Sequence, residues 1–334
     1  MITFASIRYE ATRYNLLGLL EECGLPKSFP YLDGRQAPKM GVGFRLRDDR
    51  HIKKILETMG FRVPGASPAE QAYIDQIRAA VDMGYSCAQT AADLHAKLDA
   101  VMRRWAADTS MATVNLKSKR STFTLDSREI FLIFNLIAPE CENLVAAWQS
   151  RYALPDVPES RERAALFSLA WNSLDNNSLD NHGERVPDLL GAGLARAVLN
   201  GDRSQAWFEI RYNSNRDALK GIARRRFLQS EMFGLCVNPE AMTEVEATAV
   251  RRMLQKHHSD IYTYEALFGL TRDGKRGTPL SSDKSALELA IADHSTIMSV
   301  LHGSEAGSKA AGVVSASDRL FAWVNNHWTS SVLR

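Results

Sequence analysis

The spacing of apolar positions along the chain predicts a mainly helical protein. Residues 4–22 carry apolar side chains at helical spacing, namely Ile7, Tyr14, Leu17 and Leu20. Further helical segments are predicted between about 48 and 120, over 160–174 and near 189–202. A capping box, Thr243 with Glu246 three residues later, opens another helical region that continues with glycine-rich breaks.

The most clearly marked helix begins at Asp126, which forms a capping box with Glu129. One face of this helix is apolar and consists of Ile130, Phe134, Ile137, Cys141, Leu144 and Trp148. Pro139 lies within the same run. Because proline lacks an N–H and its ring collides with the preceding turn, a kink or a break is expected there.

One region, residues 30–46, has the pattern of strands. Met40, Val42 and Phe44 alternate with polar residues and glycines, as in a half-buried strand. The dipeptide Asp33-Gly34 just before them is a common turn former. The pattern therefore predicts a small hairpin or a three-stranded ribbon.

Composition narrows the function classes. The 334 residues are 45% hydrophobic and 24% charged, which is typical of a globular protein. A net charge of +2 gives no argument for nucleic acid and is compatible with an anionic polymer. The four cysteines lie far apart, and the histidines lack metal-ligand spacing, so no metal site is expected. The sequence also has no P-loop and no G-x-G-x-x-G motif, and no organic cofactor is expected.

The N-terminal segment has acids and tyrosines where a signal peptide needs an apolar core. No uninterrupted apolar run reaches the ~20 residues of a membrane span. We therefore expect no membrane span. We also expect synthesis in the cytoplasm, with any action outside it depending on a separate delivery route or on a longer parent protein.

Two acids in unlike settings suggest acid–base chemistry by a pair of carboxyl groups. Glu10 lies on the first predicted helix among apolar positions, and Asp33 lies at a polar turn. Burial favours the protonated form of a carboxylic acid, whereas a hydrated carboxylate stays ionised. Glycoside hydrolysis needs one acid of each kind. On the residues alone, the default interpretation of Glu10 is an ordinary surface acid, and Asp33 can be a plain turn former.

Several segments, in this order, resemble the phage-type lysozymes and the related pesticin-like muramidases. A glutamate-bearing helix, ITFASIRYEA, is followed by PYLDG and by KMGVGF. Later, the helix from Asp126, the segment RERAALFSLAWNSL, and AWFEIRYNSN with GIARRRFLQSEMFG follow the same plan. The resemblance covers about residues 1–47 and 121–235.

The resemblance implies an α+β, mainly α, lysozyme-like fold with two lobes and a small β lobe. It implies a catalytic domain over 1–235, in which 48–120 is a helical insertion. Residues 236–334 would be a helical extension.

The resemblance also implies roles. Glu10 would be the general acid, and Asp33 would stabilise positive charge on the sugar or orient the attacking water. The backbone at Gly41 and Gly43 would approach the sugar or a facing helix closely. The remaining candidates for binding or support are Tyr31, Lys39, Tyr212, Asn213 and an arginine near Glu10, which would be Arg225 or Arg226. For Tyr212, core packing is an equal alternative.

The chain departs from the family pattern at Lys39, where the family has a threonine whose hydroxyl helps to position water. Glu10 and Asp33 are also farther apart in sequence than is usual for the family, so Glu22 is an alternative acid. A third departure is Gln229, where relatives often carry glutamate. We favour Glu10 because IRYEA lies on the family-like helix, while Glu22 precedes a helix-end signal.

The resemblance implies a peptidoglycan hydrolase, a muramidase that cleaves between N-acetylmuramic acid and N-acetylglucosamine. The absence of a secretory signal and the extra segments favour an antibacterial toxin or a secretion-system effector. By analogy with such toxins, an immunity protein would be its partner. The alternative is a non-catalytic wall-binding module of the same fold, for which Lys39 is the best support.

Overall fold

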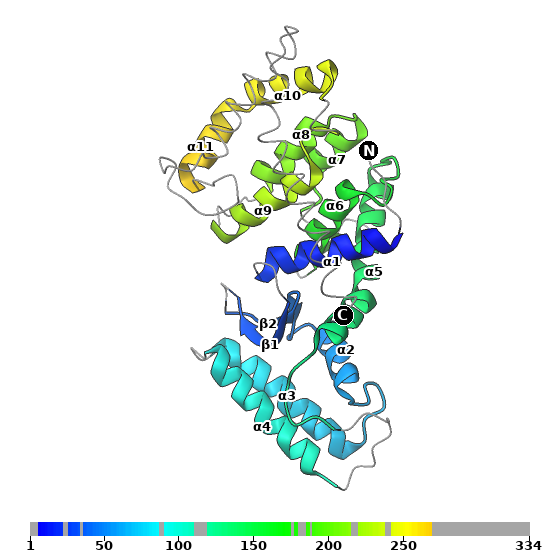
Figure 1. Cartoon of the computed structure of the whole chain (residues 1–334), viewed down its shortest axis with the longest axis vertical. Coiled ribbons are helices and arrows are strands. Elements are labelled where there is room, and N and C mark those ends of the chain that lie inside the picture. Colours follow the sequence, from blue (N-terminus) through cyan, green and yellow to red (C-terminus); the bar gives the residue numbers. More distant parts are fainter. Residues whose placement is uncertain are drawn as a thin grey trace. The chain divides into compact units, whose positions relative to one another are not determined.

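The computed structural model describes ten stretches of the chain, namely 6–22, 26–33, 36–86, 90–109, 119–174, 177–179, 185–187, 189–214, 220–237 and 242–268. The described part is mainly helical with a small antiparallel sheet, which confirms the coarse fold class predicted from the sequence. The chain forms two compact units (Figure 1). Unit 1 comprises Met1–Leu16 and Glu140–Leu333, and unit 2 comprises Leu17–Pro139.

Unit 2 contains the predicted three-stranded sheet. Strands β1 (Lys27–Leu32), β2 (Pro38–Gly41) and β3 (Phe44–Arg45) pair antiparallel in the order β1-β2-β3. The ladder between β1 and β2 shifts register between Lys27 and Tyr31, where Pro30 has no N–H to contribute. The sheet therefore starts three residues earlier than predicted and accommodates a proline at an irregularity.

The alternating residues Met40, Val42 and Phe44 are all fully buried, as their spacing predicts. They do not form one strand, however, because Gly41 and Gly43 have positive φ angles of 64° and 87° and turn the chain between β2 and β3. A Cβ atom at Gly41 would lie 2.5 Å from the Phe44 ring and 3.2 Å from Ile130. The close approach at Gly41 is therefore to the protein's own core, including Ile130 on the facing helix α5 (Ser127–Arg151).

Replacement of Gly41 by alanine is expected to destabilise unit 2 by about 2–4 kcal/mol, because left-handed backbone and overpacking each cost about 1–3 kcal/mol. Gly201→Ala is the matched control, since Gly201 has nearly the same φ angle, 65°, and open space around it. Urea unfolding of both variants separates the two costs. Equal losses of stability would show that the Phe44 contact contributes nothing.

The segment read as a helical insertion forms α2 (Asp49–Met59), α3 (Pro68–Ser86) and α4 (Ala91–Ala107). Helices α3 and α4 pack together, and α4 also packs on β1 (Figure 1). In α2, the fully buried His51 accepts the backbone N–H of Arg45 at Nδ1 over 3.0 Å, which fixes β3 to this helix. Burial lowers the pKa of His51 to about 4, so the imidazole is neutral and can accept this bond.

Two helices contribute to both units, α1 (Ser6–Glu22) and α5 (Ser127–Arg151). The predicted capping box of α5 is formed, with the Glu129 N–H donating to Asp126 over 2.9 Å and the Asp126 N–H to Glu129 over 3.0 Å. The prediction of a break at Pro139 is wrong, because α5 runs through it. The boundary between the units nevertheless falls directly after this proline.

Within the described part of the chain, α5 alone is long and apolar enough to cross a membrane, judged by length and composition, with a mean hydropathy of 1.5. A core helix of a globular protein has the same composition, and Ile133, Phe134 and Cys141 are fully buried in this structure. The length and hydropathy of α5 therefore do not by themselves indicate a membrane protein.

The remaining elements belong to unit 1. They are α6 (Arg161–Asn172), β4 (Asn177–Leu179), β5 (Arg185–Pro187), α7 (Ala192–Leu199), α8 (Arg203–Phe208), the π-helix η1 (Glu209–Asn213), α9 (Lys220–Phe233), α10 (Glu244–Lys256) and α11 (His258–Phe268). Helix α6 is buried on nearly every side and packs on α9 (Figure 1). The β4–β5 ribbon lies outside residues 30–46, the one region in which the sequence pattern predicts strands.

The described part of the predicted C-terminal extension is helical and begins as predicted. Thr243 and Glu246 form the reciprocal capping box of α10. Helix α10 packs on α8 and α11 packs on η1, so both belong to unit 1 with the elements before residue 236. The packing of α10 and α11 therefore gives no domain boundary at residue 236.

Candidate functional site

Asp33 lies at the corner between β1 and β2, in unit 2. One carboxylate oxygen, Oδ1, accepts the backbone N–H of Ala37 over 2.9 Å. The other, Oδ2, lies 3.2 Å from the Lys39 ammonium. Backbone bonds from Asp33 to Ala37 and from Gln36 to Asp33 close the turn itself. Gly34, the predicted turn partner of Asp33, lies outside the described residues.

Lys39, where the chain departs from the lysozyme pattern, is thus the ionic partner of Asp33. Its position follows from the sheet register, because Lys39 on β2 lies opposite Tyr31 on β1, two residues before the aspartate. Tyr31 is buried, and the Lys27 ammonium lies 4.4 Å from the centre of its ring. Strands β1 and β2 therefore bring Tyr31, Asp33 and Lys39 together.

Glu10 lies on α1, in unit 1, between the buried Tyr9 and Ala11, and is itself half-buried. Among the residues that the structure describes, none forms a hydrogen bond or ion pair with its carboxylate. A carboxylic acid in this setting lacks both full hydration and a fixed cation. Its surroundings thus differ from those of Asp33 in the way that the two acids of a glycosidase differ.

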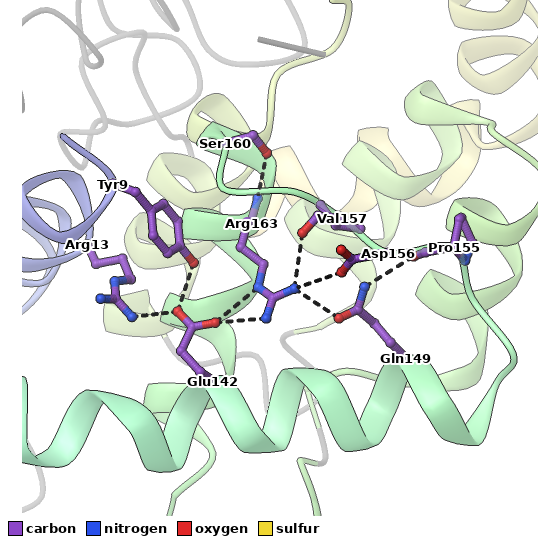
Figure 2. A network of polar contacts seen from close by, with 9 residues as sticks. All are labelled: Tyr9, Arg13, Glu142, Gln149, Pro155, Asp156, Val157, Ser160 and Arg163. Carbon is purple, nitrogen blue, oxygen red and sulfur yellow. Dashed lines mark hydrogen bonds and ion pairs between the residues drawn. The ribbon is translucent and has the colours of Figure 1, made fainter. Parts of the chain in front are cut away.

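A network of polar contacts next to Glu10 joins α1, α5 and α6 (Figure 2). Its centre is Glu142 on α5, whose Oε1 accepts the Tyr9 hydroxyl over 2.8 Å and Arg13 Nη1 over 2.6 Å. Oε2 accepts Nε of Arg163 over 3.0 Å, and Nη2 of Arg163 lies at the same distance. Arg163 also donates to Gln149 and to the carbonyl of Val157. One carboxylate is therefore shared by two arginines and a tyrosine.

Tyr9 has a fixed role in this network. Burial, followed by the Glu142 carboxylate, raises the pKa of its phenol far above the usual range. The hydroxyl therefore stays protonated and acts as a donor to Glu142 under all ordinary conditions.

The arginines expected near Glu10 have other partners. Arg225 on α9 donates to Asn172 at the end of α6. Arg226 is fully buried and donates to Gln229 and to the carbonyl of Ser214, and burial lowers its pKa to about 9. Gln229 thus gives Arg226 a neutral partner and also donates to Ser168 over 2.9 Å.

Tyr212 and Asn213, the candidate sugar-binding pair, lie in the π-helix η1. The Tyr212 ring is buried against Trp207, Phe208 and Tyr264, which is the core-packing alternative for this residue. Asn213 is exposed, and its amide donates to Glu209 over 2.7 Å. Only Asn213 of this pair presents its side chain to solvent.

Glu22, the alternative acid, is the last residue of α1, and its side chain lies outside the described residues. Cys23 and Cys87 also lie outside them, while Cys141 and Cys236 are buried free thiols. In the described stretches, no group of three or more His, Cys, Asp and Glu side chains could hold a metal ion.

Comparison with protein-family models, with curated proteins and with solved structures found no match to this chain.

Sequence reasoning missed the network around Glu142. Two signals could have found it. Tyr9 and Arg13 are four residues apart and therefore share a face of α1. Glu142 is an acid next to the buried Cys141, in the long apolar helix α5, and a carboxylate that is partly removed from water favours cationic or donor partners.

Proposed function

We propose that this protein is a peptidoglycan hydrolase, a muramidase in which Glu10 and Asp33 are the two carboxylates. The observation that supports it most is the contrast between their surroundings. Glu10 is half-buried and has no ionic partner among the described residues, whereas Asp33 is held by a backbone N–H and the Lys39 ammonium. A proton donor and a fixed anion need such unlike settings.

In the proposed reaction, Glu10 protonates the departing glycosidic oxygen of the bond between N-acetylmuramic acid and N-acetylglucosamine. Asp33 stabilises the positive charge that develops on the sugar, a water molecule then adds to the anomeric carbon of N-acetylmuramic acid, and the proton that this water loses restores the acid form of Glu10. Its turn is closed by backbone bonds, so the carboxylate needs little reorganisation in the transition state. Lys39 fixes the direction of Oδ2 and cannot position water as a threonine hydroxyl would.

The proposed substrate is polymeric and anionic, and the reaction needs no cofactor. The lysozyme-like motifs, together with the additional helices α2 to α4 and α10 to α11, support a role as an antibacterial toxin or effector that acts on the cell wall. An immunity protein that blocks the site is the corresponding partner. Both statements rest on analogy with the family.

A second function is favoured by one contact, the ion pair between Asp33 and Lys39. An aspartate with both oxygens engaged is a weaker base for water. A non-catalytic module that binds the cell wall with the same fold would retain this pair as a structural feature of the turn.

Turbidity and sedimentation of purified peptidoglycan separate the two functions. The muramidase reduces turbidity, and Asp33→Asn loses most of that activity while still sedimenting with the polymer. Asp82→Asn is the matched control, because Asp82 is an exposed aspartate that also pairs with a basic side chain, Arg47. Wild-type protein that sediments with peptidoglycan without reducing its turbidity would favour the binding module.

A further inference from the structure

A cation lies one helical turn from the proposed acid. Arg13 follows Glu10 by three residues on α1, and side chains at this spacing are neighbours on a helix surface. A glutamate and an arginine so placed ordinarily attract each other, and a cation beside a carboxylic acid favours its ionised form. A general acid must instead carry a proton at the working pH.

The Arg13 side chain is turned to other partners. Its Nη1 lies 2.6 Å from Glu142 Oε1, as Figure 2 shows. The guanidinium also lies over two aromatic rings, 4.6 Å from the centre of Tyr9 and 4.9 Å from that of Phe167. Arg13 is buried, so these contacts are made away from competing water.

Glu142 is itself firmly held in place. Arg163 occupies its second oxygen, and Gln149 and the carbonyl of Val157 in turn hold Arg163. The Arg163 backbone N–H also donates to Ser160, the N-cap of α6, over 3.2 Å. The carboxylate that binds Arg13 is therefore fixed by α6 independently of α1.

We propose that Glu142 is a positioning residue that holds Arg13 away from Glu10 and thereby leaves the proposed acid without a cationic partner among the described residues. The inference rests on the proposed function in one respect, namely that Glu10 is the general acid. The sequestration of Arg13 by Glu142 is a property of the folded chain that can be measured without any activity.

Charged and titratable side chains near Glu10 in sequence lie on its own helix, and others hold Arg13 or are expected near the acid. On α1 they are Arg8, Tyr9, Arg13 and Tyr14, all within four residues of Glu10. Glu142 on α5 and Arg163 on α6 belong to the network that holds Arg13, and Arg225 on α9 is the arginine that the resemblance implies near Glu10. Arg225 donates to Asn172 and Arg163 to Glu142, so both cations are engaged elsewhere. Arg13 is therefore the buried cation whose release would act on Glu10 from its own helix.

The test compares Glu142→Gln, Arg13→Gln and the double variant in the full-length protein. Glutamine at 142 keeps the size of the side chain but not its charge. In Glu142→Gln, the alkaline limb of the pH profile of kcat/KM should move down by about one pH unit, because the released Arg13 favours ionised Glu10. In the double variant and in Arg13→Gln, the limb should lie at its wild-type position.

The inference would be overturned if the alkaline limb of the pH profile did not move in Glu142→Gln, or if it stayed shifted in the double variant. If Glu142 had only a structural role, removal of Arg13 would not return the limb to its wild-type position. Should Glu142→Gln fail to fold, Glu142→Asp replaces it. That variant withdraws the carboxylate from Arg13 by one methylene, and a smaller shift in the same direction is expected.

Carboxyl carbon NMR of Glu10 separates this inference from the proposed function. Its titration midpoint should fall in Glu142→Gln and return in the double variant, even in a protein that does not cleave peptidoglycan. A shift with rescue in an inactive wild type would keep the positioning role and reject the muramidase. An unchanged midpoint in an active enzyme would reject the positioning role alone.

Discussion

Replacement of Glu10 by glutamine is expected to reduce peptidoglycan hydrolysis by about 10²- to 10⁴-fold, the contribution typical of a general acid. Glutamine has the same size but no ionisable proton. Because Glu10 is half-buried and forms no ion pair with the described residues, its replacement should leave the fold and the binding of peptidoglycan unchanged. Turbidity loss measures the first effect, and sedimentation with the polymer measures the second.

Glu22→Gln is the matched control, since it makes the same change at the other end of α1. The proposed assignment predicts full activity for this variant. An active Glu10→Gln protein together with an inactive Glu22→Gln protein would transfer the acid role to Glu22.

Replacement of Glu162 by glutamine is expected to destabilise unit 1 by about 3–5 kcal/mol, as is usual when one partner of a buried ion pair is removed. Glu162 is buried in the first turn of α6, where it binds Arg203 and lies 3.8 Å from Arg161. Both arginines also donate to backbone carbonyls at the end of α9 and directly after it. Arg161 donates to Cys236 and Val237, and Arg203 to Phe233 and Gly234. Without the carboxylate, these two cations lack their shared counter-charge.

Thermal or urea unfolding measures this loss, with Asp156→Asn as the control. Asp156 also lies near an arginine, Arg163, at 3.5 Å, but its side chain is 88% exposed. Exposed pairs contribute about 0–1 kcal/mol, so the control should unfold close to the wild-type midpoint. Equal unfolding midpoints for the two variants would show that the Glu162 cluster does not stabilise unit 1.

Local patterns predicted the elements of the chain well. The capping boxes at Asp126 and Thr243 both form, because each depends on two side chains within one helical turn. The strand pattern from Met40 to Phe44 found the sheet and its buried face. It missed the turn within that pattern, since alternation of burial does not show that Gly41 and Gly43 have positive φ angles.

Contacts between distant segments were beyond the sequence pattern. Arg225 was expected near Glu10, and its described partner is Asn172, which is 53 residues away. The sequence singled out Lys39 as a departure but could not show that it pairs with Asp33, because that contact depends on the register of β1 and β2. Glu142 was missed for the same reason, since its partners Tyr9 and Arg13 precede it by more than 120 residues.

The most direct test of the central claim is mass spectrometry of the soluble fragments released from purified peptidoglycan by the wild-type protein. The account predicts disaccharide-peptides that end in a reducing N-acetylmuramic acid, absent from the Glu10→Gln digest. Fragments with a reducing N-acetylglucosamine, or no fragments from a folded protein that sediments with the polymer, would contradict it.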